Sequence, residues 1–168
     1  MPNTSKTKTP PSQSSNSVPL TRFPADVAVL PEILSHVAKS CATAKLESNL
    51  SLHIELTVEE LFTNTTNYGQ KEEGNADVWV AVCVDNKTSD SQTVRLVYHD
   101  SGPPFNPFVG LKLPFSGKIQ NKPIGSIGTA LVIGLTTQAH YRRENDRNVM
   151  EFELISNLSD VKDGEKND

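Results

Sequence analysis

The sequence predicts an α+β fold, a two-layer sandwich in which helices cover one face of a mostly antiparallel sheet. Three observations predict it. Two helical patterns occupy residues 26–45 and 50–68, two hairpin patterns occupy residues 77–99 and 139–155, and a stretch rich in glycine and proline separates the hairpins. Because helices and strands occur in blocks rather than in strict alternation, we expect an antiparallel sheet.

The two ends of the chain differ in composition from the rest. Met1 is the one apolar residue of 1–17 and Val161 is the one apolar residue of 160–168, whereas the whole chain of 168 residues is 36% apolar. Segments this poor in apolar residues bury too little surface to offset the entropy of ordering. We therefore predict one domain at 18–159 between two polar tails, of which the first is disordered.

Composition also argues against several classes of protein. No apolar run approaches the roughly 18 residues that indicate a membrane-spanning helix, and the N-terminus lacks the apolar core of a secretory signal. The net charge of −4 and the lack of a long basic run argue against nucleic acid as a direct partner. Cys41 and Cys83 form no CxxC pair and fit a reducing compartment, so we expect a cytoplasmic protein.

The first elements are a short strand and a helix. Residues 18–23 alternate as a strand does, and Pro24 ends it. Asp26 is a suitable N-cap for a helix that runs to Lys45, with Pro31 tolerated in its first turns, where amides lack helical acceptors. The apolar residues at helical spacing are Val27, Leu30, Ile33, Leu34, Val37, Ala38 and Cys41.

A second helix is predicted over residues 50–68. Asn49 or Ser51 is the expected cap, and Gly69 is the expected stop. The predicted apolar stripe contains Leu52, Leu56, Leu61 and Phe62.

Two hairpins complete the sheet. Residues 77–84 alternate valines with Trp79, Ala81 and Cys83, which indicates a strand partly buried on both faces. A turn at 85–90 leads into its partner at 93–99. The long loop of about 24 residues that follows, 100–123, exceeds ordinary loop lengths. A short helix at 127–138 precedes the second hairpin, with strands at 139–143 and 149–155 and a turn at 144–147.

Polar residues gather on one face of the second helix. Glu60, Asn64 and Asn67 lie at positions i, i+4 and i+7, and Asn64 opens a run of poor helix formers, Asn-Thr-Thr-Asn. A helix that presents a carboxylate and amide oxygens to a cation or polar ligand gains from such a run. Fraying towards Gly69 is the alternative explanation.

Two further segments have the chemistry of a site. Asp100-Ser101-Gly102-Pro103 follows a strand, where a carboxylate before glycine points into a pocket or forms part of a tight turn. Gly125-Ser126-Ile127-Gly128-Thr129 opens a helix, and glycines there expose backbone amides to an anion. The spacing matches neither a P-loop nor the dinucleotide fingerprint.

In this order the three segments resemble the boxes of the Bergerat ATP-binding fold of the GHKL superfamily. Residues 58–69 (VEELFTNTTNYG) resemble the N box, 100–105 (DSGPPF) the G1 box and 125–128 (GSIG) the G2 box. The likeness covers about residues 18–156. Within the superfamily the chain is most similar to bacterial anti-sigma factors that are serine-protein kinases, because the G1 box continues as Pro-Pro-Phe-Asn-Pro and the last hairpin is similar.

The resemblance implies a role for each of these positions. Glu60 would be the catalytic general base, and Asn64 would bind Mg²⁺ and thereby the phosphates of ATP. Asn67 would assist near the phosphates. Asp100 would accept a hydrogen bond from the adenine amino group, and Gly102 would give the base room. The cofactor-binding residues of the G2 box would be Gly125, Ser126, Ile127, Gly128 and Thr129, with the ATP lid at 103–124.

The same resemblance implies a function and partners. The protein would bind MgATP, sequester a sigma factor, and phosphorylate a serine of an anti-anti-sigma protein with a STAS domain; relatives often act as homodimers. The chain departs from the family at Ser126, where the G2 box usually has glycine, and at Leu30 or Pro31, where relatives carry a helix-one arginine. A nucleotide-sensing module without phosphotransfer and a catalytic domain of the histidine kinase type are the alternatives.

Overall fold

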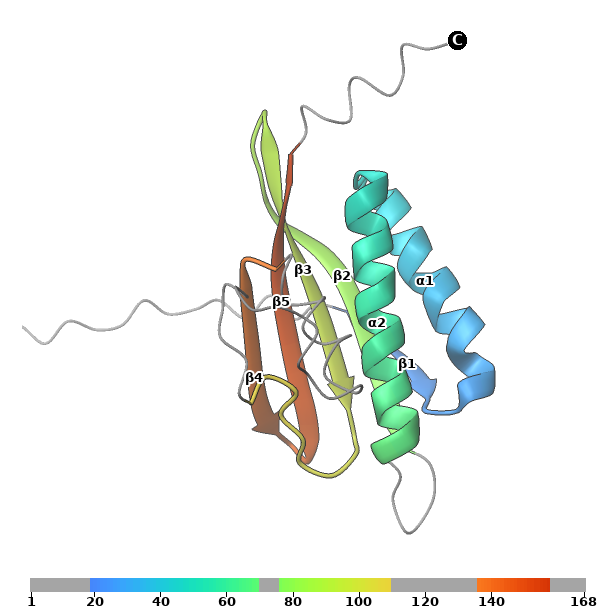
Figure 1. Cartoon of the computed structure of the whole chain (residues 1–168). Coiled ribbons are helices and arrows are strands. Elements are labelled where there is room, and N and C mark those ends of the chain that lie inside the picture. Colours follow the sequence, from blue (N-terminus) through green and yellow to red (C-terminus); the bar gives the residue numbers. More distant parts are fainter. Residues whose placement is uncertain (1–18, 70–75, 110–135, 158–168) are drawn as a thin grey trace, which may run out of the picture.

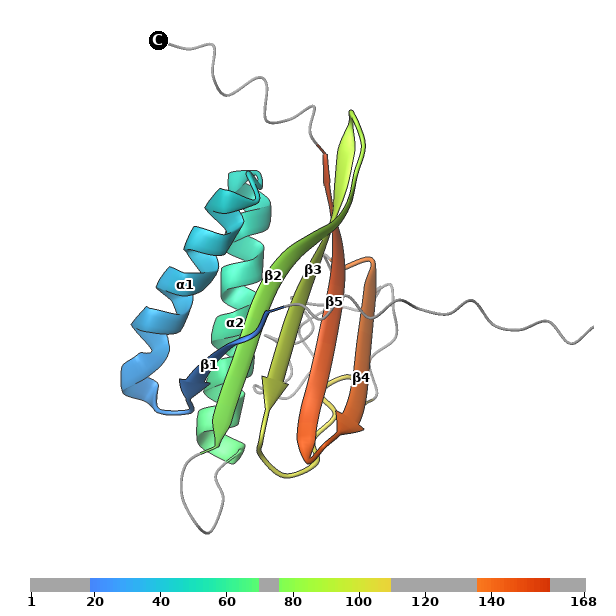
Figure 2. The same ribbon diagram turned by 180° about the vertical axis from the view of Figure 1, so that it is seen from behind.

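The computed structural model describes residues 19–69, 76–109 and 136–157. Its elements, in chain order, are β1 (Thr21–Pro24), a 3₁₀-helix η1 (Val27–Val29), α1 (Leu30–Thr43), α2 (Ser48–Tyr68), β2 (Asp77–Lys87), β3 (Ser91–Asp100), β4 (Gln138–Glu144) and β5 (Arg147–Asn157). The strands form one sheet in the order β1-β2-β3-β5-β4, with each neighbouring pair antiparallel. Both helices pack on one face of this sheet (Figures 1 and 2), which confirms the predicted α+β sandwich.

The first helix begins more gradually than predicted. The carboxylate of Asp26 accepts a hydrogen bond from the Ala28 amide at 2.9 Å, as expected of a cap, but the turn that it caps is the 3₁₀-helix η1. Pro31 then lies in the first turn of α1. Val27 is 71% exposed, so its assignment to the apolar stripe is wrong. Val27 belongs to the 3₁₀-helix η1, which has about three residues per turn. Its side chain is therefore rotated away from the face that continues along α1.

The ends of α2 differ in how well the sequence predicted them. The helix begins after Glu47, whose carbonyl accepts from the Ser51 amide, so the predicted caps Asn49 and Ser51 lie inside the first turn. The predicted stop at Gly69 is confirmed. A Cβ atom at Gly69 would lie 2.6 Å from the Thr65 carbonyl oxygen, so a larger residue does not fit this tight end.

The buried face of α2 also corrects the predicted stripe. Leu61 and Phe62 are buried as expected, but Leu52 and Leu56 are 55% and 51% exposed. The buried stripe of α2 instead begins at Leu50 and continues in steps of three and four residues. Leu52 is two positions after Leu50, which places it on the opposite side of the helix. The buried residues of α2 are Leu50, His53, Ile54, Thr57, Val58, Leu61, Phe62 and Thr65.

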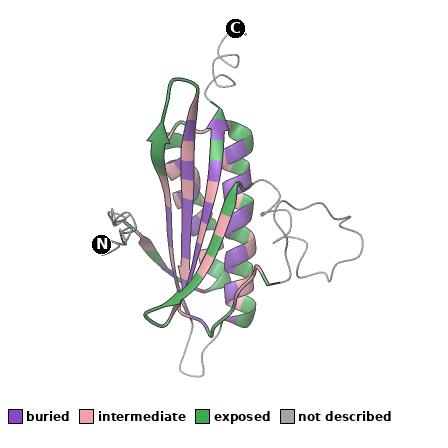
Figure 3. Cartoon of the chain, turned by 90° about the vertical axis from the view of Figure 1, so that its left-hand side faces the viewer, coloured by how far each residue is buried: buried purple, intermediate pink, exposed green. Residues whose placement is uncertain are grey.

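The core lies between this stripe, α1 and the inner face of the sheet. Alternate residues of β3 and β5 point into it and are buried, as the purple bands of Figure 3 show. The first hairpin is longer than predicted, because β2 continues to Lys87 through a bulge between Val84 and Asn86. The inward residues of the two central strands include Val94, Leu96, Tyr98, Met150, Phe152 and Leu154.

The second hairpin closes at the predicted turn, residues 144–147. Asn145 and Asp146 have φ angles of 49° and 58°, the paired positive values of a two-residue type I′ turn. At the other end, the predicted helix 127–138 is wrong in its last three residues, because residues 136 and 137 are not helical and Gln138 already belongs to β4. The Thr137 amide and hydroxyl both donate to the Glu153 carbonyl, so pairing with β5 replaces helical bonding there.

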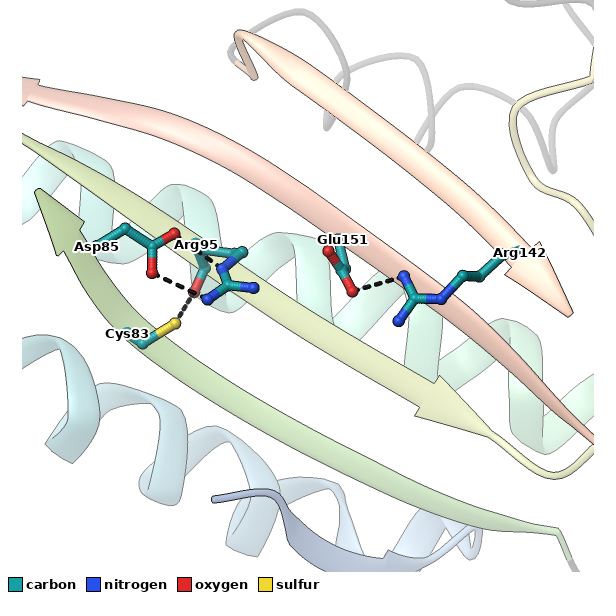
Figure 4. A network of polar contacts seen from close by, with 5 residues as sticks. All are labelled: Cys83, Asp85, Arg95, Arg142 and Glu151. Atoms are coloured by element: carbon teal, nitrogen blue, oxygen red, sulfur yellow. Dashed lines mark hydrogen bonds and ion pairs between the residues drawn. The ribbon is translucent and has the colours of Figure 1, made fainter. Parts of the chain in front are cut away.

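The outer face of the sheet, away from the helices, carries charged pairs (Figure 4). Arg95 pairs with Asp85 at 2.8 Å, and its carbonyl accepts a hydrogen bond from the Cys83 thiol at 3.4 Å. Arg142 of β4 pairs with Glu151 of β5 at 2.6 Å. Cross-strand pairs of opposite charge give a solvent-facing sheet surface a modest stabilisation.

Several predictions concern residues outside the described ranges. These are the two tails, 1–17 and 160–168, most of the loop 100–123, and the helix predicted from residue 127 up to residue 135. Among the helices of residues 19–69, 76–109 and 136–157, none is long and apolar enough to cross a membrane.

Replacing Tyr98 by phenylalanine tests the link between α2 and the sheet. The Thr65 hydroxyl donates to the Leu61 carbonyl, so the buried Tyr98 hydroxyl donates to Thr65 across 2.9 Å. We expect Tyr98→Phe to lower the free energy of unfolding, measured with urea, by about 1 kcal/mol. The matched control is Tyr68→Phe on the 74% exposed Tyr68, which should change nothing. Equal stability of Tyr98→Phe and the wild type would contradict the link.

The two cysteines should differ in reactivity. Cys41 is 1% exposed, and burial raises the pKa of its thiol to about 11, whereas Cys83 is only half-buried. Because the thiolate is the reactive form, a thiol reagent at pH 8 should label Cys83 in a fast phase and Cys41 only as the protein unfolds. A Cys83→Ser variant should lose the fast phase. Retention of that phase would show that Cys41 is accessible.

Candidate functional site

A pocket opens where the C-terminal end of α2 meets the end of β3 and the start of β5, at the lower end of the molecule in Figure 1. Its volume is about 150 Å³. Pockets that enclose a whole drug-sized ligand measure about 300–1,000 Å³. The part of the pocket formed by the described residues is therefore large enough to enclose only part of such a ligand. The helix and the two strands line it with Leu61, Asn64, Thr65, Asp100, Asn148 and Met150.

Asp100, predicted as the base-binding carboxylate, lies in this pocket. It ends β3 and is only 5% exposed. Its Oδ1 accepts one hydrogen bond from the Gly102 amide and one from the Asn148 side-chain amide, both at 2.8 Å. These donors satisfy a buried carboxylate, which would otherwise be costly to bury. The pocket therefore has a fixed acceptor on one wall.

Gly102 turns the chain directly behind this carboxylate. A Cβ atom at Gly102 would lie 2.9 Å from both the Gly69 Cα atom and the Asp100 Oδ1 atom, so no larger residue fits. The turn is also tied to the start of β2, because Ser101 and Asp77 exchange hydrogen bonds of 2.9 Å. The glycine predicted to give a ligand room thus also lets the end of α2 approach the turn.

The polar face of α2 is only partly gathered at the pocket. Asn64 lines the pocket, and its Nδ2 donates to Glu60 Oε1 at 3.2 Å. The Asn64 Oδ1 atom, the oxygen that a cation would use, is thereby directed away from Glu60. Asn67 is exposed and is not one of the residues that line the pocket, so its role stays a prediction.

Asn148 is a residue of the site that the sequence did not reveal. It is 1% exposed, faces Asp100 across β3 and β5, and touches both the carboxylate and the segment after β3. The alternation along β5 could have indicated it, because Asn148 lies on the same inward face of the strand as the apolar residues Met150 and Phe152. A side-chain amide on a buried, apolar face needs buried hydrogen-bond partners.

The segment after β3 forms another wall of the pocket. Pro103, Pro104 and Phe105 line it, and the Phe105 amide donates to Asn148 Oδ1 at 3.1 Å. Phe108 packs edge-on against Phe152 with ring centroids 5.6 Å apart. Phe108 therefore anchors the start of the predicted lid to the core, whereas the side chain of Phe105 is left 53% exposed.

A hydrogen bond from the un-ionised Tyr98 hydroxyl holds α2, which forms the helical wall of the pocket. Burial raises the pKa of Tyr98 well above its usual value, so its hydroxyl keeps the proton that it donates to Thr65. Because Thr65 lines the pocket, this bond fixes the wall of α2 relative to β3.

The predicted phosphate-binding residues lie outside the described ranges. These residues are Gly125, Ser126, Ile127, Gly128 and Thr129. The described part therefore presents an apolar slot with a buried carboxylate at one wall and an amide–carboxylate pair, Asn64 and Glu60, on the helix. Such a slot can accept a planar group that bears a hydrogen-bond donor.

Comparison with known proteins identifies the kind of domain. The family model of the histidine kinase-like ATPase domain, a member of the GHKL superfamily, matches residues 23–154, which include every described element except the ends of β1 and β5. No curated protein matches the chain. The antiparallel sheet with two helices on one face agrees with the fold of this superfamily. The chain belongs to the family of histidine kinase-like ATPase domains.

Proposed function

We propose that this protein is a cytoplasmic ATP-binding regulator of the anti-sigma type, which binds MgATP and phosphorylates a serine of an antagonist with a STAS domain. The observation that carries the proposal is the anchored Asp100 carboxylate in a pocket that is also lined by Asn64, which is hydrogen-bonded to Glu60. A buried acceptor from β3 and an amide oxygen from α2 suit the base and the Mg²⁺-bound phosphates of a nucleotide.

The adenine ring is assigned to the end of the pocket at Asp100. Its amino group would donate to the carboxylate, and the apolar walls formed by Leu61 and Met150 would cover the ring. The Gly102 amide and the Asn148 amide both donate to Asp100 Oδ1. The carboxylate therefore cannot turn without breaking them, so the acceptor is oriented before the ligand arrives.

The magnesium ion and the phosphates are assigned to the helical end. The residues fit a hard cation, because Asn64 Oδ1 is an oxygen ligand and the 3.2 Å hydrogen bond from Asn64 Nδ2 to Glu60 Oε1 directs this oxygen away from the carboxylate. Mg²⁺ usually takes few protein ligands and is completed by phosphates and water. When bound, it would supply charge neutralisation of the phosphate oxygens.

The proposed reaction transfers the γ-phosphoryl group to a serine. The serine oxygen forms a bond to the γ-phosphorus, and the bond from that phosphorus to the bridging oxygen breaks, so that ADP leaves with the electron pair. The serine proton passes to the Glu60 carboxylate, which lies on the same helical face as Asn64. Phosphorylation of the antagonist would then determine how long a sigma factor stays bound to this protein. We also expect the protein to act as a homodimer.

A second candidate function is a nucleotide-sensing module without phosphotransfer. One observation favours it: α1, which spans Leu30–Thr43, contains no arginine, whereas the proposed kinase class is expected to use one there. In this case MgATP would change the affinity for a protein partner by binding two conformations unequally. Phosphoserine formation distinguishes the two functions.

Removal of the Asn64 amide tests nucleotide binding. We expect the wild type to bind MgATP in a calorimetric titration, and Asn64→Ala to weaken binding by about tenfold or more through loss of a ligand to a charged partner. Asn49→Ala is the matched control, because Asn49 is exposed in the first turn of the same helix. A wild type that does not bind MgATP would refute the proposed function.

Replacement of Glu60 by glutamine tests catalysis separately from binding. Loss of the proton acceptor should leave MgATP affinity within a few-fold and slow phosphoserine formation by about 10²–10⁴. The assay measures transfer of labelled γ-phosphate to a STAS-domain protein, with acid stability identifying phosphoserine. Glu59→Gln, at the exposed neighbouring acid, should transfer normally. Binding without transfer by the wild type would favour the sensing module, and an acid-labile product would favour a histidine kinase.

A further inference from the structure

Asn148 uses both ends of its side-chain amide. Its Nδ2 donates to Asp100 Oδ1 and to the Pro103 carbonyl, both at 2.8 Å. Its Oδ1 accepts from the Phe105 amide at 3.1 Å, the Tyr141 hydroxyl at 2.9 Å and the Arg143 guanidinium at 3.1 Å. One buried side chain therefore joins β3, the segment after it and β4.

The partners determine which way the amide faces. Tyr141 and Arg143 supply N–H or O–H groups to one end, and the carboxylate of Asp100 accepts at the other. A flipped amide would place Nδ2 against the donors and Oδ1 against the Asp100 oxygen, which are two unfavourable arrangements. The donor of Asn148 is thus held towards Asp100.

A second contact strengthens this arrangement. Arg143 Nη1 donates to the Gly102 carbonyl at 2.8 Å as well as to Asn148. The same guanidinium therefore holds the amide and the turn whose Gly102 amide is the other donor to Asp100. Both donors that orient the carboxylate are themselves fixed from β4.

We propose that Asn148 is a positioning residue that sets the selectivity of the pocket for a purine with a 6-amino group, by holding the Asp100 carboxylate in the orientation that accepts from that group. The inference rests on the proposed function, because it assumes that the pocket binds a purine nucleotide. Asn148 acts through Asp100 and is not assigned a contact with the ligand.

The prediction concerns two nucleotides that differ at one position. ITP carries an oxygen where ATP carries the 6-amino group, so position 6 of its base accepts a hydrogen bond and cannot donate one to Asp100. The wild type should bind MgATP at least about tenfold more tightly than MgITP, because a hydrogen bond to a charged group is lost. If Asn148 acts through Asp100, its substitution lowers ATP affinity and leaves ITP affinity nearly unchanged.

Asn148→Asp is the sharpest variant. It keeps the shape of the side chain and an acceptor for Tyr141 and Arg143, but it replaces the donor to Asp100 by a second carboxylate oxygen. Calorimetric titration should show the ATP-to-ITP affinity ratio falling towards one. Asn148→Asp that keeps the wild-type ratio, or that weakens both nucleotides by the same factor, would overturn the proposal, because a merely structural residue affects both equally.

A control isolates the effect. Asn157→Asp makes the same chemical change on the same strand at an exposed position. This variant should keep the wild-type ratio, and a collapse of the ratio in it would also overturn the proposal. A wild type that binds neither nucleotide refutes the proposed function itself, whereas a wild type that binds both equally refutes only this inference.

A measurement on the wild type covers the case in which Asn148→Asp fails to fold. The side-chain amide of Asn148 gives its own NMR signals, and its nitrogen donates to the buried Asp100 carboxylate and to the Pro103 carbonyl. Saturation with MgATP should shift these signals more than saturation with MgITP does, because only ATP carries a 6-amino group that can donate to the shared acceptor Asp100. Equal shifts, or none, would overturn the proposal.

Discussion

The bond between the Asn148 amide and the Asp100 carboxylate is the interaction on which the pocket depends. It joins β3 to β5 at the point where the two residues face each other in register, and it lies beside the Gly102 amide, which donates to the same oxygen. A carboxylate that is 5% exposed is tolerated because these donors replace water. The pocket consequently holds a buried, oriented acceptor before any ligand is present.

The helix α2 is positioned against this acceptor by two other constraints. Gly102 approaches Gly69 so closely that a Cβ atom at Gly102 would lie 2.9 Å from the Gly69 Cα atom, and this contact brings the end of the helix against the turn. One turn earlier, the hydroxyl groups of Thr65 and Tyr98 meet inside the core. The polar face with Glu60 and Asn64 is therefore carried by a helix fixed at its C-terminal end.

Local patterns predicted much of the fold and part of the site. Asp26, Gly69 and the turn before β5 were found because capping and turn chemistry depend on neighbouring residues alone. Leu52 and Leu56 were misplaced because a leucine-rich helix such as α2 offers more than one apolar phase, and packing chose the phase of Leu50. Gln138 was assigned to a helix because its partner, β5, is distant in sequence.

The sequence by itself determined the α+β class, the order of the elements in the described ranges, and the pairing of Glu60 with Asn64, since residues four apart on a helix share a face. It also placed Asp100 at the end of a strand. Only the tertiary structure decided that Asn148 orients that carboxylate and that Arg143 supports both. The Arg143–Gly102 and Asn148–Asp100 contacts join residues 41 and 48 positions apart, and hydrogen bonds between distant segments follow from sheet register rather than from local spacing.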